Sequence, residues 1–174
     1  MNAKIYMTQD EFLSSISNYN EFQVESKTLW LNKNIQSKII KILNHKYPKL
    51  RLRYKVIKNL KTASHNTSVW FLEEIGKERP ISFAVAINNR QIVDIQILEF
   101  RESRGFEISI PAFAKQFTMA KLNNNGKLDK KIDGITGASM SVSAMKKISR
   151  VALMLHNYIN KKSNLDNEEL VKIK

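Results

Sequence analysis

Cysteine is absent from this chain, and glycine, proline and histidine are rare. The lack of Cys excludes disulfides, thiolate chemistry and Cys-based zinc or iron–sulfur sites. The three histidines, His45, His65 and His156, are too scattered to suggest a metal site, and we expect none. Five Gly and three Pro argue against a collagenous or linker-dominated chain. A redox role would therefore need a borrowed cofactor.

Long apolar runs are also missing. No stretch approaches the roughly 18 consecutive apolar residues of a membrane span, and the start of the chain lacks the apolar core of a signal peptide. We therefore expect a soluble chain. Such a chain is compatible with the cytoplasm and with an exported protein in mature or trimmed form.

Negative charge is in short supply. Lys and Arg total 29 against 16 acidic residues, which gives the 174-residue chain a formal net charge of +13. A charge of this size attracts polyanions, phosphoesters or an acidic partner from a distance, but the sign alone does not choose among them.

The apolar periodicity predicts helices first and then strands. Thr8 and Glu11 fit a capping box for a helix ending near Ser17, and a second helix is expected over residues 32–44. Alternation then predicts a strand from residue 50, followed by strands at 67–75, 81–87 and 91–100. Short turns between them imply an antiparallel meander.

The last third of the chain is predicted to be mainly helical. A helix is expected to start at Pro111, with Phe113 and Phe117 facing inward, and the final helix is expected over about 141–161. The polar residues from 163 onward are expected to fray. We predict an α+β protein with an antiparallel sheet flanked by helices. Its parts would be a helical segment at 1–48, the main domain at 49–161 and a polar tail at 162–174.

The segment from Asp133 to Ser141 concentrates small and hydroxyl residues before the final helix. Free amides and the dipole at a helix start stabilise anions, so the segment resembles a phosphate site. The alternative is an ordinary turn with Ser139 or Ser141 as helix cap. No histidine is near in sequence to activate a serine, and we assign no catalytic residue.

A second basic feature is the strand with Arg51, Arg53 and Lys55. Alternation places Tyr54 on the opposite face from these charges, which favours a solvated sheet face over a nucleic-acid surface. The broader alternative for the whole chain is a basic module that binds nucleic acid or an anionic surface and carries no flavin.

The same segment resembles the flavin-attachment motif of the FMN-binding domain family, D-x-x-[ST]-G-A-[ST]-x-[ST]. Every fixed position of that motif is filled, and the resemblance extends over about residues 69–155. The matching residues are Asp133, Thr136, Gly137, Ala138, Ser139 and Ser141.

The resemblance implies a role for each part of the segment. The hydroxyl of Ser139 would be esterified to the phosphate of FMN, while Gly137 and Ala138 would leave room for the phosphoribityl group. A separate magnesium-dependent flavin transferase would attach FMN, with FAD as donor. The loop of residues 99–106 similarly resembles a family loop that approaches the flavin, with Glu102 and Gly105 as the matching residues. Phe106, Phe117 and Trp70 are candidates for the apolar wall beside the ring.

The family also implies partners and a location. We expect an electron carrier that meets redox partner proteins, with a membrane-bound redox complex as a candidate setting, and no nucleic acid. Family members usually work outside the cytoplasm, so an extracytoplasmic, periplasmic location is expected. A flavin-using reductase that acts on a small acceptor is the remaining alternative.

Overall fold

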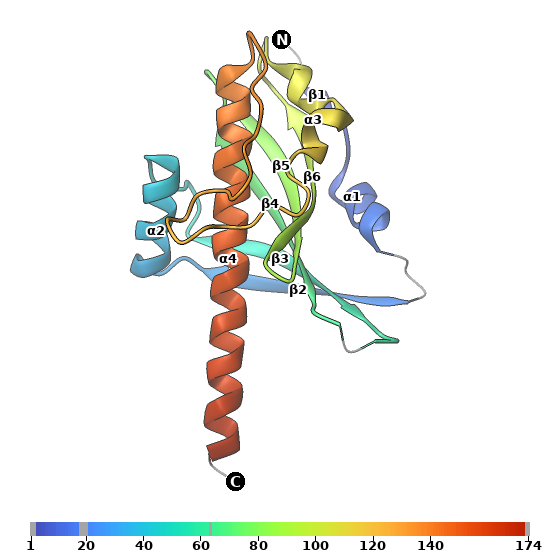
Figure 1. Cartoon of the computed structure of the whole chain (residues 1–174), viewed down its shortest axis with the longest axis vertical. Coiled ribbons are helices and arrows are strands. Elements are labelled where there is room, and N and C mark those ends of the chain that lie inside the picture. The colour runs from blue at the N-terminus through green and yellow to red at the C-terminus, as the bar shows by residue number, and fades with distance from the viewer. Residues whose placement is uncertain (1–2, 18–20, 63, 173–174) are drawn as a thin grey trace.

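Six strands form one open antiparallel sheet in the order β1-β6-β5-β4-β3-β2. The computed structural model describes residues 3–17, 21–62 and 64–172 (Figure 1). The strands are β1 (Lys4–Ile5), β2 (Phe22–Trp30), β3 (Arg51–Asn59), β4 (Thr67–Ile75), β5 (Pro80–Asn88) and β6 (Gln91–Phe100). The helices are α1 (Gln9–Ile16), α2 (Lys33–Leu43), the 3-10 turn η1 (Phe106–Ser109), α3 (Pro111–Lys115) and α4 (Ser139–Lys172).

The predicted fold class and meander are confirmed. Each pair from β3–β4 to β5–β6 is antiparallel, and the bounds of β4 and β6 agree with the predicted ranges. Both early helices begin as predicted: Thr8 and Glu11 form the capping box of α1, and Asn32 caps α2. Local side-chain chemistry was sufficient here because each signal lies within a few residues of the element it starts.

The segment at 1–48, predicted to be helical, contains two strands in addition to its two helices. β2 lies between α1 and α2 and pairs along its whole length with β3, from Phe22 opposite Asn59 to Trp30 opposite Arg51. Its residues are exposed or half-buried, so the strand carries little of the apolar alternation that marks a buried strand. The short strand β1 was missed as well, and it pairs with the end of β6.

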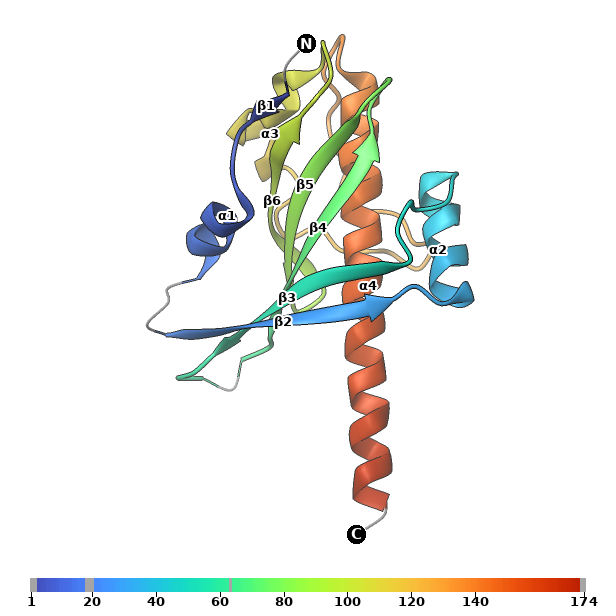
Figure 2. The same ribbon diagram turned by 180° about the vertical axis from the view of Figure 1, so that it is seen from behind.

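The sheet has two apolar faces of unequal size. The larger core lies between the sheet and the helices α2, α3 and α4, and it includes Trp70, Phe83, Met145 and Leu155. The smaller core lies under α1 and includes Phe12, Leu13, Val69 and Leu98. Figure 2 shows α1 on the opposite side of the sheet from α4, with much of the β2–β3 ribbon left uncovered.

Helix α4 is the longest element and differs from its predicted range at both ends. It begins at Ser139, two residues earlier than predicted, and continues to Lys172 through the segment that was expected to fray. Figure 1 shows the last turns extending past the sheet, and their residues are exposed. Helix formers such as Leu165, Glu168, Glu169 and Leu170 favour continuation over fraying. Within the described residues, no helix combines the length and apolar content needed to cross a bilayer.

Candidate functional site

The start of α4 is formed by a tight turn. The N–H of Ala138 donates to the carbonyl of Ile135 at 3.0 Å, which closes a turn through Thr136 and Gly137. The carbonyl of Ala138 then accepts the first helical hydrogen bond, from the N–H of Val142 at 2.9 Å. Ser139 is therefore the first residue of the helix, and the first amides of α4 have no carbonyl partner within it.

The two serines of the motif lie in opposite environments. Ser139 is exposed, whereas Ser141 is only 2% exposed. Ala138, which precedes Ser139, is also 2% exposed and anchors the turn to the core. Of these two hydroxyls, the one on Ser139 is open to a reagent from outside.

Gly105 brings the predicted flavin loop against the motif. Its backbone has a φ of +90°, and a methyl group at its Cα would lie 2.3 Å from Ser141 Oγ and 3.8 Å from Ala138 Cα. Glycine is required here both by the left-handed backbone and by the lack of space. The structure thus brings together two segments that are more than 30 residues apart in the sequence.

Gly137 stands in a different environment. Its φ is +81°, yet a methyl group at its Cα would meet nothing within 4 Å. Gly134 likewise faces open space. The turn before Ser139 is therefore free on its outer side.

Glu102 points toward a different part of the molecule. Its Oε1 accepts hydrogen bonds from the N–H of Glu78 at 2.6 Å and the N–H of Arg79 at 2.9 Å, in the turn between β4 and β5. Burial raises the pKa of Glu102, but the backbone amides of this turn, together with Arg79, outweigh it and hold the pKa below its ordinary value. The carboxylate fixes the turn between these strands.

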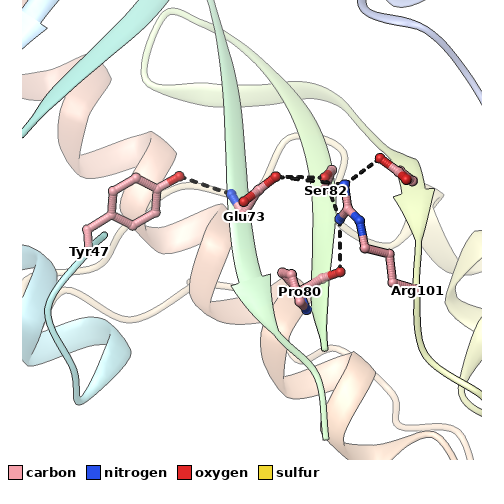
Figure 3. A network of polar contacts seen from close by, with 6 residues as sticks. Tyr47, Glu73, Pro80, Ser82 and Arg101 are labelled. Carbon is pink, nitrogen blue, oxygen red and sulfur yellow. Dashed lines mark hydrogen bonds and ion pairs between the residues drawn. The ribbon is translucent and has the colours of Figure 1, made fainter. Parts of the chain in front are cut away.

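Arg101 fixes the same loop to the sheet through hydrogen bonds and ion pairs (Figure 3). One guanidinium nitrogen donates to the Pro80 carbonyl and to Ser82 Oγ, each at 3.0 Å. The other nitrogen pairs with Glu99 and lies 3.9 Å from Glu73 Oε1. The guanidinium of Arg101 is thus occupied by contacts within the sheet, whereas Arg104, later in the same loop, is exposed.

Tyr47 extends this network toward α2. The N–H of Glu73 donates to the Tyr47 hydroxyl at 3.1 Å. Burial raises the pKa of Tyr47 to about 12. The phenol therefore stays protonated at any ordinary pH.

Asp133 and Thr136 are held on the outer side of the motif. The N–H of Asp133 donates to the Gln116 side chain at 2.8 Å, which ties the motif to the end of α3. Both the Asp133 and the Thr136 side chains are exposed. The role of Gln116 was not predicted, because its partner lies 17 residues away along the chain.

Two of the three aromatic candidates cannot form a flavin wall. Trp70 and Phe117 are fully buried, and Trp70 stacks on Tyr54 with ring centroids 4.4 Å apart. Phe106 is 53% exposed and follows Gly105 at the contact with the motif. Met140, next to Ser139, is 52% exposed and was missed by the sequence reasoning, although its position inside the motif was a usable signal.

The middle of α4 holds a buried polar network. Trp70 Nε1 donates to Ser68 Oγ at 2.8 Å, and Ser68 Oγ lies 2.6 Å from His156 Nδ1. Asn160 Nδ2 lies 2.9 Å from the other ring nitrogen of His156. Burial lowers the pKa of His156 to about 4, so the ring is neutral at pH 7.

The basic strand has the predicted arrangement. Arg51 and Arg53 are exposed, while Tyr54 is buried on the opposite face in the larger core. The arginines line a cavity of about 720 Å³ on the open sheet face, together with Trp30 and Lys49. This surface lies across the sheet from α4.

The comparisons with known proteins concern the part of the chain that carries the motif. The model of the FMN-binding domain family matches residues 76–154. No curated protein matches the chain. The family match confirms the predicted resemblance and indicates FMN as the cofactor of a flavin-binding protein. The matched segment holds both the Gly105 loop and the start of α4, so both lie in the part of the chain that is similar to the FMN-binding domain family.

Proposed function

We propose that this protein carries electrons through FMN joined by a phosphoester to Ser139 Oγ. The observation that carries the proposal is the exposure of Ser139 at the first residue of a 34-residue helix, inside the segment that matches the family. A phosphodiester at this place keeps one negative charge. The open amides and the helix dipole stabilise that charge.

The surroundings of Ser139 fit a group as large as FMN. A methyl group at Gly137 or Gly134 would touch nothing within 4 Å, so the turn leaves room for the phosphoribityl chain. Phe106, which follows Gly105, and Met140, which follows Ser139, both offer exposed apolar surface. These two side chains are our candidates for the surface beside the isoalloxazine ring.

The remaining motif residues act on the turn. Ala138 anchors it to the core, and Ser141 packs against Gly105, so the position of Ser139 is set from both sides. Exposed Asp133 and Thr136 are placed to contact the phosphoribityl group from the outer side. Glu102 contributes indirectly, because it holds the turn that supports the Gly105 loop.

The attachment requires another enzyme. A flavin transferase would supply FAD, the Ser139 oxygen would attack the FMN phosphorus, and AMP would leave as the pyrophosphate bond breaks. The Ser139 proton would pass to a base of the transferase. Bound FMN supplies a ring that takes up and returns one or two electrons, and the chain holds it in place.

We propose redox partner proteins and a place outside the cytoplasm as the setting of this carrier. Both are carried over from the FMN-binding domain family, whose model matches residues 76–154. Cell fractionation of the natural host with an antibody to this chain tests the location. Recovery in the cytoplasmic fraction would contradict it.

Intact mass tests the acceptor. Co-expression with a flavin transferase should add one FMN-sized increment to the parent chain and none to Ser139→Ala, while Ser143→Ala should load normally. Because Ser139 is exposed, its substitution should change the free energy of unfolding by less than about 0.5 kcal/mol. An unloaded parent, or a loaded Ser139→Ala, would refute the acceptor assignment.

Turnover separates a carrier from a reductase. Loaded protein should exchange electrons stoichiometrically with small mediators and should show no saturable steady-state reduction of an organic acceptor. Saturable turnover would favour the reductase alternative.

A further inference from the structure

A basic groove lies beside the start of α4, on the side of the helix that faces away from the sheet. The groove has a volume of about 450 Å³ and lies between the segment 127–132 and residues 143–150 of α4. Figures 1 and 2 show this segment passing along α4 opposite the sheet. Six basic residues line the groove: Lys127, Lys130, Lys131, Lys146, Lys147 and Arg150.

The groove adjoins the predicted flavin position. Its nearest helical residue, Ser143, is one turn beyond Ser139 on α4. With a rise of about 1.5 Å per residue, Lys146 and Arg150 lie roughly 10 and 17 Å from Ser139 along the helix axis. The other wall ends at Ile132, directly before the motif. An occupant of the groove would therefore lie next to the flavin.

Three of the six cations are held in place by backbone carbonyls. Arg150 Nε donates to the Gly126 carbonyl at 2.8 Å, Lys130 Nζ to the Thr118 carbonyl at 2.8 Å and Lys147 Nζ to the Leu43 carbonyl at 3.5 Å. These carbonyls orient the side chains but do not neutralise their charge.

The groove has no internal counter-charge. No acidic residue lines it, and none of its six cations forms an ion pair with any residue that the structure describes. Like charges gathered in one groove repel one another, and an anionic occupant relieves that repulsion. The fold thus holds six positive charges ready for a negatively charged surface.

The lining and the shape of the groove favour a protein as the occupant. Leu128 and Ile132 line the groove but are packed into or against the core, and Ile132 is only 5% exposed, so the accessible groups of the groove are mainly its cationic side chains. No aromatic side chain lines the groove, whereas single-stranded nucleic acid is commonly held by stacking on aromatic rings. A flat bilayer surface fits a concave groove poorly.

We propose that the basic groove docks an acidic face of the protein that exchanges electrons with the flavin. This inference rests on the proposed function, because docking beside Ser139 matters only if the flavin is there. Opposite charges on the two proteins would speed their encounter and fix the orientation in which the partner meets the flavin.

Two variants that each remove three positive charges test whether docking depends on the groove. Lys127, Lys131 and Lys146 have no side-chain partner in the described parts of the chain, so the groove variant Lys127→Gln/Lys131→Gln/Lys146→Gln should keep the fold. The control variant Lys49→Gln/Arg51→Gln/Arg53→Gln removes the same charge from the open sheet face. Thermal unfolding checks that both remain folded.

The probes are a 12-residue oligo-glutamate peptide and two oxidants of opposite charge. Stopped-flow reoxidation of the reduced, loaded protein at low ionic strength should be roughly tenfold slower with ferricyanide in the groove variant. With cationic tris(phenanthroline)cobalt(III) it should be faster. The peptide should inhibit ferricyanide reoxidation of the parent and the control, but not of the groove variant. The control should differ from the parent by less than about twofold in each rate.

Several results would overturn the proposal. Equal changes in both variants would mean that net charge alone acts. Tighter groove-dependent binding of an oligonucleotide, or of phosphatidylglycerol vesicles, than of the peptide would assign another class of occupant. If the groove variant alone failed to load FMN, the groove would serve the transferase instead.

Measurement of the intact mass distinguishes a failure of the docking inference from a failure of the proposed function. If the parent takes up no FMN, the proposed function fails, and calorimetric titration of the peptide still compares the two variants directly. If the parent loads but the peptide binds both variants equally, only the docking inference fails.

Discussion

Ser139 at the start of α4 and His156 in its middle are polar residues in opposite environments. At the start, Ser139 is exposed and the turn before it opens to solvent. In the middle, His156 is 2% exposed and contacts Ser68 on β4 and Asn160 on its own helix. A buried hydroxyl with partners serves the fold, whereas an exposed hydroxyl at a helix start is available for chemistry.

The contrast explains where substitutions should affect stability. Groups in the middle are desolvated, so a change in their charge or shape acts on the free energy of unfolding. Ser139 and the outer side of the turn before it are solvated, so the same kind of change there should act on the cofactor. Three predictions test this division, beginning with the largest expected effect on stability.

Protonation of His156 should destabilise the fold in acid. Burial lowers its folded pKa to about 4 from an unfolded value near 6.5, so its contribution is fully present above pH 6.5 and is lost as the pH falls toward 4. The loss is on the order of 3 kcal/mol, at about 1.4 kcal/mol per pKa unit. Denaturant unfolding of the parent and of His156→Gln between pH 4 and pH 7 measures it, and the variant should lack this component.

His45 provides an internal control of opposite sign. The Lys46 carbonyl raises its pKa against burial, and Glu74, at 2.7 Å, adds to the rise. Its contribution is therefore present below pH 6.5 and disappears as the pH rises through the folded pKa. Equal pH profiles for the parent and His156→Gln would contradict the assignment to His156.

Gly105→Ala should destabilise the fold by roughly 2 kcal/mol, because it combines an unfavourable positive φ with overpacking. The new methyl group would lie 2.3 Å from Ser141 Oγ. Chemical denaturation measures the effect. Adding Ser141→Ala should recover the part due to the oxygen and leave the part due to the backbone, and a double variant no more stable than Gly105→Ala would argue against this contact.

Gly137→Ala should cost about 1 kcal/mol, since only its φ of +81° resists the new side chain. Its larger effect should be on FMN loading, because the methyl group would enter the space that we propose for the phosphoribityl chain. Parallel mass and unfolding measurements compare it with Gly105→Ala. A fully loaded Gly137→Ala would show that this space is not used.

The sequence predicted those features whose signals are local. The strands β4 and β6 follow from alternation, and the start of α4 follows from nine consecutive residues, 133–141. The edge strand β2 was not predicted because its residues are exposed or half-buried, so its sequence lacks the apolar alternation of a buried strand. The strand is held instead by pairing with β3. Its partner residues lie more than 20 positions away.

The site was predicted in part for the same reason. The family resemblance implied that the Gly105 loop approaches the flavin, which stays a prediction, whereas the packing of Gly105 against Ser141 required coordinates. Glu102 accepts hydrogen bonds from backbone amides that are 23 and 24 residues away along the chain, so this role could not be predicted from the local sequence. Trp70 and Phe117 could be recognised as aromatic but not as fully buried.

The projecting end of α4 has a consequence for local opening. Residues 162–172 are exposed, and an isolated helical stretch of this length is marginal in water. Amide hydrogens there should exchange through local opening of the exposed helical turns, while those near Met145 and Ile148 should exchange only on global unfolding. We therefore expect amide protection factors along this single uninterrupted helix to cover nearly the full range found in the molecule.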